Sequence, residues 1–470
     1  MMDKNISINT PASVNDVAAA LRSAGAVVML VGGAVVDALL GKDPKDWDLE
    51  VFGLSLEQVE EATKRWHPKP VGKAFGILKM SAKETGGIDI DVSVPRVDNC
   101  VGTGHKDFEV EFDPDMTPEE AARRRDFTIN SLLYDLANHR VIDPFGGLDD
   151  LEDGVLRATD PELFVQDPVR PLRAMQLAAR KAPYVDTPTM NLMRGMADDE
   201  VWNHLAKERV AEEFCKLLMK AERPSIGLEV LRKSGWLIAF PELNQLVNCL
   251  QNPDHHPEGD VWTHTILVVD AMAELCREHG IEGIRRKVLM FAALCHDLGK
   301  PVTQLEDLSS PKHDTEGEEL VRSFLERMTT EKKVVEGVAA LSRTHMRPFG
   351  LVSGGARDSR WNRLKKDLGQ HATLEDAGYL SRADWVGSRP RGIRSIDGTS
   401  ADGDAHMIAG ECWRMFAELE KAEPLVGGRD LISAGVTPGP EMGKLIKAAY
   451  AIQLDEPELS KDELIDRVMG

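Results

Sequence analysis

The chain has 470 residues, a formal net charge of −21 at pH 7, and 42% hydrophobic but only 5% aromatic residues. This length predicts several domains, because domains usually have roughly 100 to 200 residues. The acidic balance argues against a surface coated with basic residues for nonspecific nucleic-acid binding, although it leaves room for local basic segments.

The sequence also argues against a membrane protein. No apolar run approaches the ~20 residues that a membrane helix needs. The six cysteines show no paired spacing, which favours a reduced compartment over a disulfide framework. We therefore expect a cytoplasmic protein without a membrane partner.

The first motif, LVGGAVVDALLG, combines two glycines with a short apolar helix. Gly32 and Gly33 end a buried apolar run and open a helix predicted over residues 34–40, which Gly41 closes. Glycines at such a turn let backbone N–H groups approach an anion closely, so the turn could hold a triphosphate. A Gly-Gly turn alone does not specify this function, but an acidic strand follows it.

That strand, DWDLEVFG, alternates acidic and apolar residues, as strands do when one face packs in a core. Asp46, Asp48 and Glu50 share one face, and Asp89 and Asp91 share a face of a second strand in GIDIDVSVPR. Neighbouring carboxylates raise one another's pKa, and a divalent cation removes that conflict. We expect Mg²⁺, which prefers carboxylates and substrate phosphates and can activate an attacking oxygen. The alternative is a solvated acidic edge.

Changes in periodicity along the chain predict the domain organisation. Strands and helices mix at first and helical periodicity dominates afterwards. DPFGGLDDL predicts a turn or hinge. Further breaks in the helical pattern lie near ERPSIG, FPELN and SRPRGIRSIDG. We predict four domains, at residues 1–145, 146–240, 241–395 and 396–470. Basic residues gather at 122–127, 170–181 and 388–394, where they form either a local nucleic-acid track or a solvated surface.

Six segments, in order, resemble the class II nucleotidyltransferase family, which comprises the bacterial-type tRNA nucleotidyltransferases (CCA-adding enzymes) and their poly(A) polymerase relatives. These segments are LVGGAVVDALLG with DWDLEVFG, DIDVSVPR, RRRDFTINSLLYD, DPFGGLDDL, QDPVRPLRAMQLAARK and HLAKERVAEEFCKLL. The resemblance implies that Asp46 and Asp48 bind the catalytic Mg²⁺, with Asp91, or else Asp89, as the third acid. It implies a nucleotide site formed by Gly32, Gly33, Asp37, Arg124, Arg125, Asp126, Gln166, Asp167, Arg170, Arg173 and Arg209. Taken alone, RRRD before FTINSLLYDL favours a plain basic start of an apolar helix.

The resemblance places base recognition in QDPVR, and the residue chemistry explains it. Asp167 and Arg170 are three apart, so on a helix they share a face and offer an acceptor beside a donor. Cytosine and adenine both present an amino donor next to a ring-nitrogen acceptor, whereas uracil and guanine present the reverse. Mismatched, desolvated polar groups are costly, so this pair would accept CTP and ATP. An ordinary surface salt bridge is the alternative.

Two residues depart from the family pattern. Val36 stands where an arginine usually precedes Asp37, which removes one expected triphosphate contact. Gln166 stands where the family usually has a glutamate. Either change could weaken nucleotide binding or alter the choice between C and A, but neither removes a metal ligand.

A second pattern resembles the HD phosphohydrolase domain that is fused to some CCA-adding enzymes. Its members are His264, His296, Asp297 and Asp384, with His313 and His345 as further candidates that are otherwise ordinary core or surface histidines. Imidazoles mixed with carboxylates suit Mn, Ni, Co, Zn or Fe, and such a metal would generate hydroxide for phosphoester cleavage. We expect a phosphodiesterase or phosphatase acting on 2',3'-cyclic or 2'-phosphorylated ends.

The end of the chain, GRDLISAGVTPGPEMGKLIKAAYAIQLD, resembles the tail of longer family members. Gly439, Pro440 and Gly443 lie around a helix start and could present backbone N–H groups to an RNA phosphate, with Lys444 adding charge. A plain helix cap is equally compatible with this pattern.

Together these patterns predict an α+β multidomain protein. A mixed α/β, polymerase-β-like nucleotidyltransferase head would precede a mostly α-helical neck, an HD domain and a helical RNA-binding tail. The expected function is untemplated addition of CCA to tRNA 3' ends from CTP and ATP, with Mg²⁺ in the head and a transition metal in the HD site. The alternatives are a poly(A) polymerase of the same family and an HD phosphohydrolase whose head has become an RNA-binding module.

Overall fold

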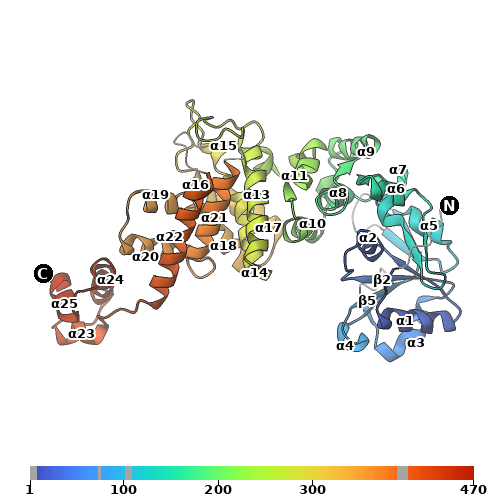
Figure 1. Cartoon of the computed structure of the whole chain (residues 1–470), viewed down its shortest axis with the longest axis horizontal. Helices are drawn as coiled ribbons and strands as arrows, with labels where there is room; N and C mark the ends of the chain where they lie inside the picture. Colours follow the sequence, from blue (N-terminus) through green and yellow to red (C-terminus); the bar gives the residue numbers. More distant parts are fainter. Residues whose placement is uncertain (1–7, 72–75, 101–107, 389–400, 470) are drawn as a thin grey trace. The chain divides into compact units, whose positions relative to one another are not determined.

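The computed structural model describes residues 8–71, 76–100, 108–388 and 401–469 (Figure 1). Two compact units make up the chain: unit 1 contains Met1–Glu213 and Ile226–Ala239, and unit 2 contains Phe214–Ser225 and Phe240–Gly470. The chain therefore crosses from one unit to the other three times. The predicted division into four domains stays a prediction.

Unit 1 is built on a mixed sheet of seven strands in the order β3-β4-β5-β2-β1-β8-β9. These strands are β1 (Val27–Val31), β2 (Trp47–Phe52), β3 (Lys69–Val71), β4 (Ile77–Met80), β5 (Ile90–Ser93), β8 (Leu133–Asp135) and β9 (Arg140–Ile142). Strands β2 and β5 run parallel, whereas every other neighbouring pair in this sheet is antiparallel. Two small sheets pair β6 (Arg96–Cys100) with β7 (Phe108–Phe112), and β10 (Val155–Leu156) with β11 (Tyr184–Val185).

The apolar faces of the two acidic strands form part of the core, as their alternation predicts. Trp47, Leu49 and Val51 of β2 are buried, and so are Ile90 and Val92 of β5. Burial of such side chains is the main driving force for folding and fixes the strand register, because a slip by one residue would expose the whole set. The acidic residues between them are therefore held on the opposite face.

Among the helices of unit 1, α2 packs against β1 and the acidic strand β2 (Figure 1). They are α1 (Ala12–Ser23), α2 (Gly33–Leu39), α3 (Leu56–Thr63), α4 (Ala82–Thr85), α5 (Pro118–Arg123), α6 (Gly147–Glu152), α7 (Pro161–Phe164), α8 (Arg170–Ala178), α9 (Thr187–Asp198), α10 (Lys207–Lys220) and α11 (Pro224–Lys233). Helix α10 continues into unit 2, and α11 begins in unit 2 and continues into unit 1. Short 3-10 helices are η1 (Lys64–Trp66), η2 (Thr128–Ser131), η3 (Val201–His204) and η4 (Trp236–Ala239). Helix α5 starts with Thr117 and Glu120 in a capping box, which satisfies two backbone N–H groups at its first turn.

Within its described residues, unit 2 contains helices and no strand. Its helices are α12 (Pro241–Asn244), α13 (Val261–Glu278), α14 (Gly283–Cys295), α15 (Lys300–Thr303), α16 (His313–Glu316), α17 (Glu318–Met328), α18 (Lys332–Thr344), α19 (Arg347–Ser353), α20 (Asp358–Leu368), α21 (Leu374–Gly387), α22 (Ala401–Lys421), α23 (Gly428–Ser433), α24 (Pro440–Asp455) and α25 (Lys461–Met469). Helices α13, α14, α18 and α21 pack against one another at its centre (Figure 1). None of the helices in the described ranges is both long and apolar enough to span a membrane.

The predicted mixed α/β head followed by helices is confirmed, and the tail is helical. In the tail, Lys444 on α24 forms an ion pair with Glu441, and Gly439 immediately precedes that helix. A role of this segment in RNA binding stays a prediction. Of the basic segment at 388–394, residues 389–394 lie outside the described residues.

Candidate functional site

The parallel pairing of β2 with β5 sets two acidic side chains beside each other. Asp48 lies directly opposite Asp91, and the exposed Asp46 immediately precedes β2. Burial and the neighbouring Asp91 carboxylate raise the pKa of Asp48 to about 6. Burial also raises the pKa of Asp91, with further contributions from Asp89 and Asp46. Arg125 near Asp48 and Lys79 near Asp91 oppose these shifts without cancelling them, so this edge of the sheet collects negative charge that its surroundings offset only in part.

The same edge is suited to a divalent cation. Oδ1 of Asp91 is buried and has no hydrogen-bond partner among the described residues. A buried oxygen of this kind normally has a partner, and a hard cation such as Mg²⁺ would supply one. Asp46, Asp48 and Asp91 therefore fit the donor set that Mg²⁺ prefers.

Asp89, the alternative third acid, has different neighbours. Its side chain accepts a hydrogen bond from the backbone N–H of Ala82 (2.7 Å) and pairs with Lys79 (3.1 Å). These two partners lower its pKa below the usual value. The structure places Asp91, and not Asp89, opposite Asp48.

Gly32 provides the close backbone approach that the Gly-Gly turn predicts. Its φ is +69°, a conformation that residues with a side chain rarely adopt, and a Cβ at this position would lie 3.3 Å from Oδ2 of Asp48. Gly33, the first residue of α2, has no atom within 4 Å of its own Cβ position among the described residues. The two glycines therefore differ: the turn requires Gly32, whereas Gly33 has space for a side chain.

Glu50 was not predicted to belong to the site, but it holds two of the predicted arginines. Its buried carboxylate accepts hydrogen bonds from Arg124 (2.5 Å) and Arg125 (2.9 Å). Burial disfavours the charged form, but Arg125 and Arg124 outweigh it and lower the pKa of Glu50. The signal in the sequence was the third acid of the D-x-D-x-E alternation. Through Glu50, β2 fixes two guanidinium groups beside Asp48, where a polyanion would need them.

Other residues predicted for the nucleotide site form ion pairs with one another or with a nearby lysine. Arg173 of α8 donates to the buried Asp126 over 2.5 Å. Burial opposes the charged form of Asp126, but Arg173 and Asn130 outweigh it and lower its pKa. Asp37 pairs with Lys181.

Val36, which replaces the usual arginine, is only 1% exposed. It therefore serves as a core side chain and makes no contact with solvent-borne phosphate.

The prediction that Asp167 and Arg170 share a helix is wrong. Helix α8 begins at Arg170, and Asp167 lies before it with the exposed Gln166 in the preceding turn. The physical reason is Pro168, because the residue before a proline is disfavoured in helical conformation.

The described partner of Asp167 is instead Arg209 of α10, which binds it in a bidentate manner at 3.0 and 2.9 Å. Arg170 donates to the backbone carbonyl of Arg124 over 2.7 Å. Arg209, predicted from the resemblance alone, is thus tied directly to the proposed base-reading carboxylate.

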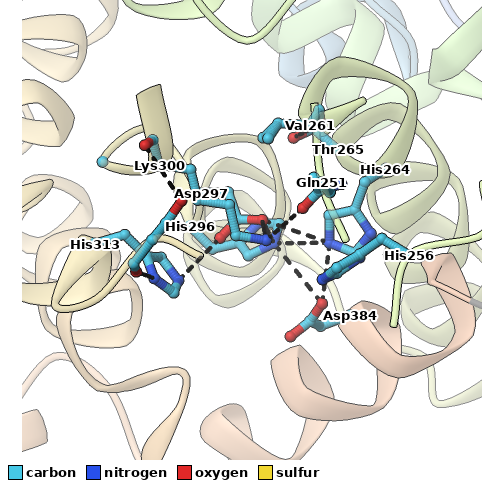
Figure 2. A network of polar contacts seen from close by, with 12 residues as sticks. Gln251, His256, Val261, His264, Thr265, His296, Asp297, Lys300, His313 and Asp384 are labelled. Atoms are coloured by element: carbon cyan, nitrogen blue, oxygen red, sulfur yellow. Dashed lines mark hydrogen bonds and ion pairs between the residues drawn. The ribbon is translucent and has the colours of Figure 1, made fainter. Parts of the chain in front are cut away.

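A second cluster forms in unit 2 around Asp297 (Figure 2). Oδ2 of Asp297 lies 3.2 Å from Nε2 of His296 and 3.6 Å from Nε2 of His264. Asp384, from α21, reaches the same place, since its Oδ1 is 3.0 Å from Nε2 of His264. The structure thus brings together all four residues of the H...HD...D pattern.

The other oxygen of Asp297 faces two more histidines. Oδ1 lies 3.2 Å from Nε2 of His313 and 3.7 Å from Nε2 of His345, and these two nitrogens are 3.2 Å apart. One carboxylate therefore lies between two groups that could each hold a metal ion. Burial, together with the neighbouring His296 and His313, lowers the pKa of His345 to about 4, which keeps this imidazole neutral, the form that binds metals.

The hydrogen bonds of the four imidazoles fix which nitrogen faces the cluster. Each Nδ1 has an acceptor that cannot donate: the carbonyl oxygens of Ala293, Ser310 and Ser342 for His296 (3.0 Å), His313 (2.7 Å) and His345 (2.6 Å), and the carboxylate of Glu258 for His264 (2.8 Å). Each Nδ1 therefore carries a proton, and each Nε2 is the nitrogen that faces the carboxylates of Asp297 and Asp384, where a bound metal would replace any Nε2 proton. Histidines and carboxylates in this arrangement fit a transition metal better than Ca²⁺ or Mg²⁺.

Four residues at this cluster were missed by the sequence interpretation. Glu258 also accepts from Nδ1 of His256 at 2.9 Å. Lys300 pairs with Oδ2 of Asp297 at 2.7 Å and donates to the side chain of Gln251 at 2.7 Å. The segments HHPEGD and HDLGKP contain three of the four, but a carboxylate or lysine near a histidine carries no signal without knowledge of the fold.

Close backbone packing positions His313. A Cβ on Gly299, two residues after Asp297, would lie 2.0 Å from the carbonyl oxygen of His313 and 2.8 Å from Cα of Gly317. Only glycine allows the two segments to approach so closely. The HDLG sequence therefore supplies both a ligand and the space that lets the second histidine group reach it.

Comparisons with known proteins agree with this arrangement. Family models match the poly(A) polymerase head domain over residues 28–157, the probable RNA- and SrmB-binding site of polymerase A over 185–246, and the HD domain over 261–387. The Multifunctional CCA protein of Xanthomonas campestris pv. campestris (strain B100) is 37% identical over 326 residues, which cover 68% of this chain and 75% of that protein. The protein of the same name from Neisseria meningitidis serogroup B is 33% identical over 84% of this chain and 96% of its own length.

Solved structures share the fold along the whole chain. The Bacillus stearothermophilus CCA-adding enzyme in complex with CTP superposes with a TM-score of 0.67, at 21% identity and 98% coverage of both chains. The Thermotoga maritima CCA-adding enzyme complexed with tRNA gives a TM-score of 0.61, at 18% identity over 100% of this chain and 99% of that one. The chain belongs to the bacterial family of tRNA nucleotidyltransferases (CCA-adding enzymes) and poly(A) polymerases, in the form that carries an HD domain.

Proposed function

We propose that the chain adds CMP, CMP and AMP from CTP and ATP to the 3' ends of tRNA, and that its HD domain is a metal-dependent phosphohydrolase for 2',3'-cyclic or 2'-phosphorylated ends. The observation that carries the first activity is Asp48 opposite Asp91 on parallel strands, within contact distance of the Gly32 turn. The names of the curated relatives support CCA addition over poly(A) synthesis.

In the head, Asp46, Asp48 and Asp91 would hold Mg²⁺, which supplies charge neutralisation at the triphosphate and a lower pKa at the attacking hydroxyl. The 3'-hydroxyl of the RNA attacks the α-phosphate in line and forms a new P–O bond, and the proton of this hydroxyl passes to water. The bond between the α-phosphorus and the bridging oxygen breaks, and pyrophosphate leaves. Arg124 and Arg125, held by Glu50, are placed to bind phosphate oxygens. Catalysis is then mainly positioning and electrostatic stabilisation.

Base selection falls to Asp167 with Arg170. A carboxylate has about four acceptor positions. In this chain Arg209 takes two, and the backbone N–H of Val169 takes one at 3.1 Å. Among the described contacts, these leave about one acceptor position, which would receive the amino group of cytosine or adenine, and Arg170 would donate to the adjacent ring nitrogen. Arg209 thus acts as a positioning residue that keeps the Asp167 carboxylate ionised and oriented.

In the HD domain, Asp297 and the five side chains around it would hold one or two transition-metal ions, which would supply a water molecule of lowered pKa as the nucleophile. Attack on a 2',3'-cyclic phosphate forms a P–O bond to that water and breaks one ester bond to the ribose. Lys300, a cation 2.7 Å from Asp297, is placed to stabilise the charge that develops on phosphate.

A pair of matched variants tests the two activities together. In the first assay, purified protein is given tRNA transcripts that lack the final A, CA or CCA, with each nucleotide in turn. In the second assay, it is given 2',3'-cAMP with Mn²⁺ or Ni²⁺. We expect Asp46→Ala to abolish nucleotide addition and leave cAMP hydrolysis unchanged, and Asp297→Asn to do the reverse. Continued AMP addition beyond CCA would instead identify a poly(A) polymerase. Loss of both activities in either folded variant would contradict two separate sites.

A further inference from the structure

Large hydrophobic side chains are exposed in the segments that contain the residues of the HD centre. Among the described residues, five of them lie within five positions of a residue of that centre: Leu250, Val302, Leu305, Met346 and Phe349. Leu250 adjoins Gln251, the next two follow Lys300, and the last two follow His345. Single exposed hydrophobic residues are common on protein surfaces, so a contact in space is needed to connect one of these five with the centre.

One of these five, Phe349, belongs to a pair of stacked aromatic rings. Phe349 of α19 and Trp385 of α21 have ring centroids 6.0 Å apart and an interplanar angle of 24°. Phe349 is still 49% exposed, so one part of its ring remains open to a ligand. Near-parallel stacking holds the ring in one orientation and prepares it to receive a flat group.

The backbone places both rings next to metal-ligand candidates. Phe349 follows His345 by four residues, and helix α19 begins between them at Arg347. Trp385 directly follows Asp384 on α21. His345 faces Oδ1 of Asp297, whereas Asp384 faces His264. The stacked pair therefore connects segments from both halves of the centre.

We propose that Phe349, supported by Trp385, is the stacking surface for the nucleobase of the nucleotide whose phosphate the HD centre hydrolyses. This inference rests on the proposed phosphohydrolase function and narrows its substrate to phosphates that carry a base. Every nucleobase has a π-face, so stacking on an aromatic ring gives affinity without strict sequence preference. A centre built this way would accept RNA ends of any sequence and discriminate against simple phosphate esters.

The test compares two substrates that differ only in the base: 2',3'-cAMP and ribose 2',3'-cyclic phosphate, each with Mn²⁺ or Ni²⁺. Phe349→Ala should raise KM for 2',3'-cAMP about tenfold with little change in kcat, and should leave KM for the ribose phosphate unchanged. Phe349→Tyr keeps the ring and should behave as wild type. Ile432→Ala, an equally exposed hydrophobic residue elsewhere in unit 2, is the matched control.

The outcomes separate this inference from the proposed function. Equal changes for both substrates, or no change for either, would overturn the stacking role while leaving phosphohydrolase activity intact. If the wild type hydrolyses neither substrate, the proposed function fails. Binding of adenosine 3'-phosphate in the presence of Ni²⁺ then decides the stacking role: weaker binding by Phe349→Ala supports it, and unchanged binding refutes it.

Discussion

Replacing Glu258 by alanine should weaken metal binding at the HD centre about 10- to 100-fold without unfolding the domain. Glu258 is the one side chain among the acceptors that orient the four imidazoles, because the other three acceptors are backbone carbonyls. It is therefore the only orienting contact of that set that a substitution can remove.

The expected magnitude follows from His264. This side chain is fully buried, and its Nδ1–H lies 2.8 Å from the Glu258 carboxylate. Without that acceptor a metal-bound His264 keeps a buried, unsatisfied N–H, which costs about 1–3 kcal/mol. In the metal-free protein, burial opposes the charged form, but Asp384 and Glu258 outweigh it and raise the pKa of His264 to about 9, so both ring nitrogens carry protons. Without Glu258 the metal-free ring can lose its Nδ1 proton and keep the Nε2–H on Asp384 at 3.0 Å, and so avoids this cost. The penalty therefore falls on the metal-bound form, and about 1.4 kcal/mol corresponds to each tenfold loss of affinity.

Isothermal titration of the metal-stripped protein with Ni²⁺ measures the effect, and circular dichroism melting confirms that the variant is folded. Glu258→Gln keeps an acceptor oxygen and should lose less affinity than Glu258→Ala. His256→Ala removes the other donor to Glu258 and should have a small effect. An affinity within about threefold of wild type in a folded Glu258→Ala variant would refute the orienting role, since it corresponds to well under 1 kcal/mol.

Two matched pairs of variants test the site in the head. Asp91→Ala should lower the rate of CMP incorporation in single-turnover assays by about 10²-fold or more, because it removes a charge that would hold Mg²⁺, whereas Asp89→Ala should change it only slightly. Similar losses in both variants would mean that the pairing of Asp91 with Asp48 is not the basis of the site. Gly32→Ala should lower the free energy of unfolding by about 1–3 kcal/mol, because residue 32 has a positive φ. The same variant should also lower the rate of CMP incorporation. Gly33→Ala should be tolerated in denaturant unfolding curves, and equal destabilisation by both would contradict the requirement for glycine at the turn alone.

The acidic strands could be predicted from the sequence because their periodicity is local. Alternation in β2 and β5 specifies which side chains are buried, and the structure agrees at Trp47, Leu49, Ile90 and Val92. Which strand lies next to which is a property of the whole sheet. The choice of Asp91 over Asp89 therefore came from the resemblance, and the parallel register now gives it a geometric reason.

Long-range pairing explains what the sequence could not predict. Asp167 and Arg209 are 42 residues apart, and no short-range pattern connects them. The nearer Arg170 was the expected partner of Asp167. Pro168 disfavours a helical conformation at Asp167, so the two residues do not share a helix. Glu258 and Lys300 likewise lie close in sequence to His264 and Asp297, but their roles depend on helices that meet only after folding.

The three crossings of the chain between its units limit how the protein can be divided. Phe214, in a segment assigned to unit 2, stacks edge-to-face on Phe240 and Phe324 of the same unit. A fragment that stops before Phe240 would retain Phe214 but lose both aromatic neighbours, and it would expose a buried aromatic surface that favours aggregation. Truncation is consequently a poor route to isolating either activity, and experiments that separate them need intact chains with single substitutions.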